Sequence, residues 1–270
     1  MTGAAGGIGR AVAERLLARG DHVIACARKI DQIADLGAAG AMVLAIDVAS
    51  DESVRAGFAG LTNLDAVVHC AAQAPLGTVE FTSPAHFAEI FNINTLGALR
   101  ILQVSAPLLR QATSGRIIVV SSLWGRVSGP FVSSYAASKH AIEAIADSFR
   151  RETGNEQVRL SIIEPGVVLT KMFDQQVPEL DRQIAALGVA EAQLYGEIYC
   201  DHRNILAKAG KGATTAKECA RRIELCLNAK RPKPRYVIGK DSKVMVVMGR
   251  LMSDRALDWV FGRLYKSTPA

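Results

Sequence analysis

The chain has 270 residues, of which 49% are hydrophobic, and its formal net charge is +6 at pH 7. An α/β chain of this length often folds as one domain with a large core. Its lysines and arginines are spread along the sequence, which argues against nucleic-acid binding. The sequence shows neither a signal peptide nor an apolar run of the roughly 20 residues that a membrane-spanning helix needs. We therefore expect one soluble, cytoplasmic domain with no integral membrane span and no nucleic-acid partner.

The cysteines form neither C-x-x-C pairs nor clusters with histidine at the spacing of metal sites. We therefore expect reduced and mostly buried thiols, and no metal site is predicted. The five are Cys26, Cys70, Cys200, Cys219 and Cys226.

The N-terminal segment TGAAGGIGRAVAERLL joins a glycine-rich turn to a helical pattern. Gly3, Gly7 and Gly9 lead directly into apolar residues at helical spacing, beginning with Ile8. Glycines let the backbone approach a ligand closely, and a helix N-terminus offers free N–H groups and a positive dipole end to phosphate. The segment predicts a phosphate cradle for a dinucleotide, with a plain glycine-rich turn as the alternative.

A strand is expected before such a turn, but only Met1 precedes Thr2. We expect that the first strand of the sheet is truncated in this sequence and that the native start lies upstream. A version extended by several apolar residues should then be markedly more stable, because those residues would supply the strand.

Strand and helix patterns alternate along the chain. This alternation is typical of a doubly wound parallel sheet with helices on both faces, a Rossmann-like α/β fold. Asp51 is predicted to cap a helix, and residues 84–111 read as one long helix. Asparagine is unfavourable inside a helix, so Asn94 is expected to bend this one or to hold a water. The strand candidates are residues 22–27, 42–46, 66–72, 117–120, 158–164 and 235–239.

The residue that follows the first strand candidate indicates the cofactor. In dinucleotide folds an acidic residue about 20 positions after the glycines binds the ribose 2′-hydroxyl, whereas an arginine accommodates a 2′-phosphate. Arg28 lies 19 positions after Gly9. NADP is therefore preferred, while Asp31 nearby keeps NAD open.

Ligands of such sheets bind at the carboxyl ends of the strands. The glycine turn, Ala71, Ala72, Ser122 and residues 165–170 all follow strand candidates or stand where one should end. We therefore expect them to converge on one crevice.

Tyr135 and Lys139 are four residues apart in a helical segment, which places them on the same face. An ammonium beside a phenol favours the phenolate and lowers a pKa that is ordinarily near 10. Ser122 could hold a substrate oxygen against that phenol. Such a pair also arises by chance on a solvated helix face, so its role depends on the rest of the chain.

Residues 167–214 show no strand pattern, and an insertion of this length suits a lid over a hydrophobic substrate. A helical hairpin packed on the core is an equal alternative. Residues 241–266 form an amphipathic tail, expected to cover the substrate pocket or a neighbouring subunit, with peripheral contact to a membrane surface as the alternative. The apolar lid residues are Phe173, Leu187, Leu194, Tyr195 and Tyr199.

Together these motifs resemble the short-chain dehydrogenase/reductase family over nearly the whole chain, and the resemblance weakens after Thr170. The stretch VVSSLWGRVSGPFVSSYAASKHA is most similar to members that act on hydroxysteroids, retinoids and other lipophilic alcohols. The matching segments are TGAAGGIG at 2–9, DV at 47–48, INTLG at 93–97, VVSS at 119–122, YAASK at 135–139 and EPGVVLT at 164–170.

The resemblance implies an oxidoreductase that moves a hydride between NADP(H), or NAD(H), and a secondary alcohol or ketone, as a homodimer or homotetramer. It implies that Tyr135 is the general acid/base, that Lys139 binds the nicotinamide ribose, and that Ser122 orients the substrate oxygen. Asn94 would hold a water of the proton relay. The implied cofactor-binding residues are Gly3, Gly7, Ile8, Gly9, Arg28, Asp47, Val48, Ala71, Ala72, Asn94, Tyr135, Lys139, Pro165, Gly166, Val168 and Thr170.

Two features depart from the family pattern. Its N-N-A-G sequence is replaced here by HCAA at 69–72, where His69 reads as a packed strand residue, and the first strand is missing. These departures keep open a noncatalytic dinucleotide-binding scaffold or sensor, and an epimerase or dehydratase could share the tyrosine and lysine. The intact Ser122, Tyr135 and Lys139 argue against a pure binder.

Overall fold

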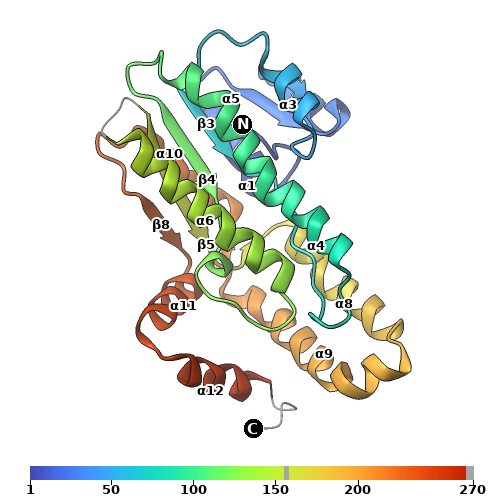
Figure 1. The fold of residues 1–270 in the computed structure, drawn as a ribbon. Coiled ribbons are helices and arrows are strands. Elements are labelled where there is room, and N and C mark those ends of the chain that lie inside the picture. The colour runs from blue at the N-terminus through green and yellow to red at the C-terminus, as the bar shows by residue number, and fades with distance from the viewer. Residues whose placement is uncertain (155–157, 266–270) are drawn as a thin grey trace.

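The computed structural model describes residues 1–154 and 158–265, and a parallel β-sheet forms its centre (Figure 1). Strands β3, β4, β5 and β8 pair in that order, and β1 pairs with β2 beside them. Every one of these pairs is parallel, which confirms the predicted doubly wound fold. The bounds are β1 (Ile24–Ala27), β2 (Met42–Ala45), β3 (Ala66–His69), β4 (Arg116–Val120), β5 (Arg159–Pro165) and β8 (Arg235–Ile238).

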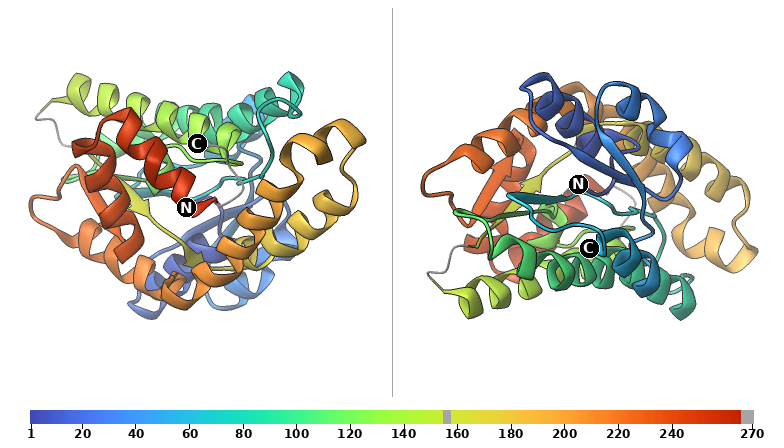
Figure 2. Two further views of the ribbon diagram at one scale, coloured as in Figure 1. Left: turned by 90° about the horizontal axis from the view of Figure 1, so that it is seen from below. Right: turned by 90° about the horizontal axis from the view of Figure 1, so that it is seen from above.

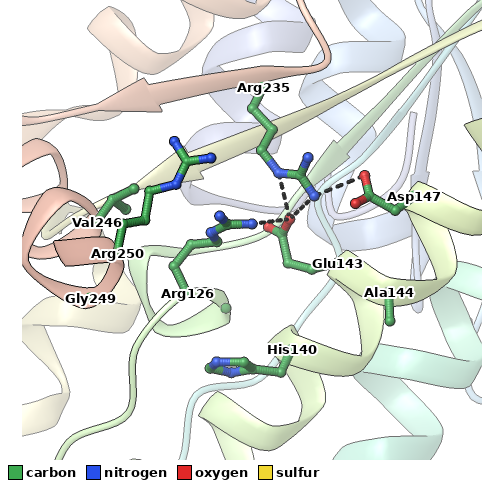
Figure 3. Close-up of a pocket in the computed structure, with 10 residues that line it drawn as sticks. Arg126, His140, Glu143, Ala144, Asp147, Arg235, Val246, Gly249 and Arg250 are labelled. Atoms are coloured by element: carbon green, nitrogen blue, oxygen red, sulfur yellow. Dashed lines mark hydrogen bonds and ion pairs between the residues drawn. The ribbon is translucent and has the colours of Figure 1, made fainter. Parts of the chain in front are cut away.

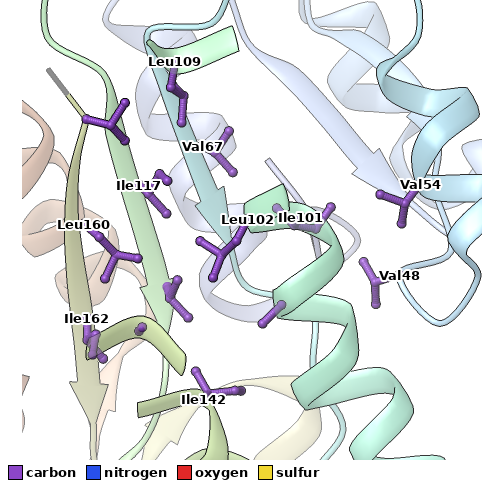
Figure 4. Close-up of a cluster of buried hydrophobic side chains, with 14 of the residues drawn as sticks. Val48, Val54, Val67, Ile101, Leu102, Leu109, Ile117, Ile142, Leu160 and Ile162 are labelled. Atoms are coloured by element: carbon purple, nitrogen blue, oxygen red, sulfur yellow. The ribbon is translucent and has the colours of Figure 1, made fainter. Parts of the chain in front are cut away.

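Helices cover both faces of the sheet, as the two views in Figure 2 show. Ile117 of β4 packs with α5 and α6 on one face (Figure 4), and Ile118 packs with α1 and α10 on the other. Successive strand residues point to opposite faces, so a strand covered on both sides is apolar at every position. The covering helices are α1 (Gly7–Ala18), α3 (Asp51–Phe58), α5 (Gly97–Leu109), α6 (Ser133–Thr153) and α10 (Ala216–Asn228).

Met1 and Thr2 occupy the position between β1 and β3. The Cys26 amide donates to the Met1 carbonyl oxygen at 2.8 Å, and the Thr2 amide donates to the Val68 carbonyl oxygen at 3.0 Å. Thr2 forms parallel bridges to both Cys26 and His69. Two residues therefore connect the β1-β2 pair with the rest of the sheet.

The predicted helix at 84–111 contains a π-helical segment where its asparagines lie. Pro84 follows the Ser83 cap of α4 (Pro84–Phe91), the π segment η2 covers Asn92–Leu96, and α5 continues the helix. π-helical turns are rare in proteins, and those that occur are often found at functional sites. Where a bend was expected at Asn94, the structure has one wider, π-helical turn within the long helix.

The helix that begins at Asp51 is capped by the residue before it. Ser50 is the N-cap of α3 and its hydroxyl accepts the Ser53 amide at 3.2 Å, so the prediction that Asp51 caps this helix was wrong. The Asp51 carboxylate instead forms an ion pair with Arg100 of α5.

The segment after β5 is mainly helical, and its helices lie beyond the carboxyl ends of the strands (Figure 1). It also contains a short parallel pair, β6 with β7, which the sequence did not predict. Two residues per strand are too few to give an apolar pattern. The elements are β6 (Val168–Leu169), α7 (Lys171–Asp174), α8 (Gln176–Ala185), α9 (Val189–Ala209), η4 (Gly210–Gly212) and β7 (Thr214–Thr215).

The tail forms α11 (Lys240–Leu251) and α12 (Asp254–Leu264), separated at Met252 and Ser253. Tyr265 is buried in a cluster with Phe131 and Tyr199, which joins the tail to α9. The tail residue Lys266 lies outside the described residues. Within residues 1–154 and 158–265, no helix has both the length and the apolar character needed to cross a bilayer.

Extending the chain by four apolar residues before Met1 is expected to raise the melting temperature. Added residues would continue the ladder between β1 and β3, and each new backbone hydrogen bond contributes about 0.5–1.5 kcal/mol. For a chain of this size the shift should be about 5 °C or more. Thermal unfolding followed by circular dichroism measures it, with a Gly-Ser extension of equal length as the control. Equal melting temperatures for the two extended chains would contradict the expectation.

Candidate active site

Ser122, Tyr135 and Lys139 meet at the carboxyl end of β4. Ser122 follows this strand and caps the short helix η3 (Leu123–Gly125), and its hydroxyl lies within hydrogen-bonding reach of the Tyr135 phenol. The Lys139 ammonium is 5.6 Å from the centre of the Tyr135 ring and donates to the Val120 carbonyl oxygen at 2.9 Å. The sequence placed these three groups together, and the structure brings them into contact range.

Burial dominates the electrostatics of these groups. It raises the pKa of Tyr135 to about 12, and the hydrogen bond with Ser122 opposes this shift only in part. The lowering of the tyrosine pKa expected from Lys139 is not found, because burial of the phenol is the largest influence on its pKa. Burial also lowers the pKa of Lys139 to about 8, although Cys70 and Glu143 raise it. The phenol therefore carries its proton at neutral pH.

Asn94 is fully buried and joins the loop after β3 to helix α6. Its Oδ1 accepts the Gln73 amide at 2.8 Å, and its Nδ2 donates to the Gln73 carbonyl oxygen at 2.9 Å and to Ser138 Oγ at 3.0 Å. The two N–H groups of the amide are therefore both used within the protein. A water of a proton relay would need another group of Asn94, such as its backbone carbonyl.

The glycine turn has the shape of a phosphate cradle. Gly3 and Gly7 have φ values of 71° and 55°, which L side chains rarely adopt, and a Cβ on Gly9 would lie 2.2 Å from the Gly3 oxygen. Gly6 caps α1 without a side-chain hydrogen bond, and the first turn of α1 carries no acidic residue. An uncapped helix N-terminus suits an anion, so the turn fits the pyrophosphate of a dinucleotide. Ile8 lies half-buried within this first turn.

The glycine turn adjoins two other predicted segments. A Cβ on Gly3 would lie 2.8 Å from the Ala71 amide nitrogen, and one on Gly7 would lie 3.3 Å from Thr170 Cγ2. Ala72 follows directly after Ala71. The ends of β3 and β5 therefore meet the turn at the same edge of the sheet, as the sequence predicted.

Arg28 and Asp47 stand farther along this edge, after β1 and β2. Arg28 is exposed, whereas the Asp47 carboxylate accepts the Ala49 amide at 2.9 Å. Val48 is buried, and a Cβ on Gly97 would lie 3.0 Å from its Cγ2. These residues neighbour the glycine turn along the sheet, and none of their described contacts reaches Tyr135.

His69 and Thr2 stabilise the loop in which the family asparagine is replaced. The Thr2 hydroxyl contacts His69 Nδ1 at 2.9 Å and accepts the Cys70 amide at 3.3 Å. Burial lowers the pKa of His69 to about 3, so the imidazole is neutral. His69 is the packed strand histidine that the sequence predicted.

The turn after β5 is held by the last strand and the tail. The Gly166 amide donates to the Ile238 carbonyl oxygen at 2.9 Å, and the Val167 amide donates to the Asp241 carboxylate at 2.6 Å. Thr170 caps α7, and its hydroxyl donates to the Val168 carbonyl oxygen at 3.3 Å. Asp241 was not predicted from the sequence, in which its position two residues after Gly239 was the only local signal.

The apolar residues of the 167–214 segment do not all face the same way. Tyr199, Tyr195 and Leu187 join the cluster around Phe131, but the Leu194 side chain is exposed. Phe173 packs beside Gly210. Phe131 lies between Ser122 and Tyr135 in sequence, so this part of the segment packs against the loop that joins these two residues.

The parallel sheet, the glycine turn and the paired hydroxyls at one edge define a dinucleotide-binding fold with an acid/base site. A family model described as short chain dehydrogenase matches residues 1–181. This chain belongs to the short-chain dehydrogenase family, and it is an oxidoreductase of the class that acts on alcohol and ketone groups.

Individual relatives cover nearly all of the chain. Oxidoreductase BOA17 of Botryotinia fuckeliana is 28% identical over 252 residues, which is 90% of this chain and 88% of the relative. The 17-beta-hydroxysteroid dehydrogenase type 6 of Homo sapiens is 28% identical over 283 residues, 97% of this chain and 87% of the relative. The solved structure of a short chain dehydrogenase from Burkholderia cenocepacia in complex with NADP has a TM-score of 0.75 and 22% identity, covering 99% and 96% of the two chains.

Asn94→Ala is expected to destabilise the fold, because it removes the partner of the partly buried amide and carbonyl of Gln73 and of the buried Ser138 hydroxyl. Such groups cost about 1–3 kcal/mol. Urea unfolding measures the change, and Asn92→Ala is the control, since Asn92 makes one partly buried hydrogen bond to the Ala49 carbonyl oxygen. Equal losses for the two variants would argue against the role of Asn94 in holding the loop.

Proposed function

We propose that this chain transfers a hydride between NADP(H) and a secondary alcohol or ketone that is lipophilic. The observation that carries the proposal is the contact between the Ser122 and Tyr135 hydroxyls beside a buried Lys139, at the edge that also holds the glycine turn. A binding protein has no need for this arrangement.

The chain's own residues would divide the chemistry as follows. Ser122 would donate a hydrogen bond to the substrate oxygen, and Tyr135 would give that oxygen a proton in reduction or remove one in oxidation. The raised pKa of Tyr135 keeps it protonated for the reductive direction. The nicotinamide, when bound, would supply or accept the hydride. Lys139 would bind the ribose hydroxyls through its ammonium.

The preference for NADP rests on Arg28. This exposed guanidinium follows β1, where a 2′-phosphate would lie if the glycine turn held the pyrophosphate. The relative of known structure from Burkholderia cenocepacia was solved with NADP. The glycine turn, Asp47, Val48, Ala71, Ala72 and residues 165–170 would complete the cofactor site.

A lipophilic substrate is supported by the apolar cluster near the catalytic loop. Phe131, Tyr199 and the tail residue Phe261 gather there, and the segment 167–214 would act as a lid within a single domain. The relative from Homo sapiens is named for a hydroxysteroid. We further propose a homodimer or homotetramer located in the cytoplasm, which light scattering and fractionation would test.

The rival functions make different predictions. A noncatalytic sensor would bind NADPH without consuming it, and an epimerase or dehydratase would leave no net oxidised cofactor. Loss of NADPH absorbance with a panel of lipophilic ketones separates both from a reductase.

Tyr135→Phe is expected to lower kcat by about 10²–10⁴, because the general acid is lost, and to leave the Kd for NADPH within about twofold. Tyr236→Phe is the control, since the Tyr236 hydroxyl lies away from the site and accepts the Lys233 amide. Full activity of Tyr135→Phe would refute the assigned role.

Arg28→Glu is expected to raise KM for NADPH about 10- to 100-fold, as the loss of a charge-assisted hydrogen bond predicts, with a smaller effect on NADH. Steady-state kinetics with both cofactors measures the effect. Lys230→Glu changes the charge equally at the opposite end of the sheet and should leave both values unchanged. An equal rise in KM for NADH would show that Arg28 does not bind the 2′-phosphate.

A further inference from the structure

Five charged side chains form a cluster beside the catalytic groups, and most of them line a cavity of about 260 Å³ (Figure 3). We call this set the ion-pair cluster. Figure 3 shows Arg126 and Arg235 converging on the carboxylate of Glu143, with Asp147 beyond it. The cluster consists of Arg126, Glu143, Asp147, Glu164 and Arg235.

Arg235 of β8 is the centre of the cluster. Its guanidinium lies 3.0 Å from Glu143 Oε2, 2.9 Å from Asp147 Oδ1 and 3.1 Å from Glu164 Oε1. Arg126 is more loosely placed, at 3.9 Å from Glu164 and 4.0 Å from Glu143. One arginine thus joins two residues of α6 to the end of β5.

Three of the five members of the cluster lie close in sequence to residues of the proposed site. Arg126 follows Ser122 by four residues, Glu143 follows Lys139 by one helical turn, and Glu164 directly precedes Pro165 and Gly166. The cluster therefore connects the catalytic loop, the catalytic helix and the turn proposed for the nicotinamide. No other described group of charged side chains joins all three.

Glu164 is the member of the cluster whose carboxyl group changes its protonation state near neutral pH. Its side chain is fully buried, and within the described residues neither carboxylate oxygen has a well-aligned hydrogen bond. Burial, together with Glu143, raises the pKa of Glu164 to about 7, while Arg126 and Arg235 oppose this shift. Asp147 also pairs with Arg150 at 3.1 Å and Arg151 at 3.3 Å, so Glu143 and Glu164 are the carboxylates that share Arg235 and Arg126.

The groups around Glu164 come from several elements. Arg126 belongs to the loop after η3, Glu143 to α6 and Arg235 to β8. From α11, Ser242 donates to the Glu164 carbonyl oxygen at 3.0 Å, and Asp241 holds the adjoining turn. Asp147, His140 and Arg250 lie around the cavity.

We propose that Glu164 is a positioning residue of the hydride-transfer site, whose ionised carboxylate fixes the Pro165–Gly166 turn against the catalytic loop and α6 and so tightens cofactor binding above neutral pH. This inference rests on the proposed function. The ionised carboxylate attracts Arg235 and Arg126, which are anchored to α6 through Glu143. The protonated carboxyl loses this attraction and leaves the turn less firmly held.

The same ionisation lowers the stability of the fold, which gives the proposal a second signature. The pKa of Glu164 is higher in the folded chain than its ordinary value of 4.5. The contribution of the Glu164 carboxyl group to the free energy of unfolding is therefore fully present below about pH 4.5 and is lost as the pH rises through about 7. Relative to Glu164→Gln, the wild-type melting temperature should fall between pH 5.5 and 8.5 while cofactor binding tightens.

The test compares NADP⁺ binding by calorimetry to wild type and Glu164→Gln at pH 5.5 and 8.5. The ratio of the variant Kd to the wild-type Kd should be near 1 at pH 5.5 and about fivefold or more at pH 8.5. A ratio is used because ionisation of the 2′-phosphate of NADP⁺ affects both proteins equally and cancels. Glu218→Gln, at an exposed pair with Arg221, should give a ratio near 1 at both values. Glu164→Asp keeps an ionisable group and should retain the pH dependence.

The outcomes separate the two proposals. A ratio that does not change with pH, while wild type binds NADP⁺ normally, would overturn the role of Glu164 alone. Loss of the pH dependence in Glu164→Asp would also overturn it. Failure of wild type to bind NADP⁺ at either pH would overturn the proposed function, and the positioning role with it.

Discussion

The hydrogen bond from the Lys139 ammonium to the Val120 carbonyl oxygen connects the two halves of the site. Lys139 is 2% exposed, and burial of a charged group without a partner costs several kcal/mol. The 2.9 Å contact therefore fixes α6 against the end of β4 and sets Tyr135 beside Ser122. The same burial lowers the pKa of Lys139 to about 8, so the side chain loses its charge as the pH rises through that value.

Around this contact the site is a polar region enclosed by two apolar layers. Asn94 connects α6 to the loop after β3, Thr2 and His69 support that loop, and Asp241 holds the turn after β5. Each of these contacts joins polar groups that are buried or partly buried and lie more than 20 residues apart in sequence. Together they keep the glycine turn and the hydroxyls of Ser122 and Tyr135 at one edge of the sheet, where the proposed hydride transfer would need them.

The sequence predicted the strands well because β3, β4 and β5 are covered on both faces and are therefore mainly apolar. Ser122, Tyr135 and Lys139 were found from local spacing, since a strand end and one helix carry them. The contacts of Glu164 with Arg235 and of Asp241 with Val167 were not predicted, because the partners are 71 and 74 residues apart. The direction of the Tyr135 pKa shift was also missed, since burial cannot be read from a four-residue spacing.

The central claim is that the Ser122, Tyr135 and Lys139 site serves a hydride transfer from a nicotinamide to a ketone carbon. The most direct measurement follows deuterium from NADPH labelled at C4 of the nicotinamide into the alcohol product by mass spectrometry, using a lipophilic ketone in ordinary water. The account predicts one deuterium on the carbinol carbon. Alcohol formed without the label, or label found only in the solvent, would contradict it.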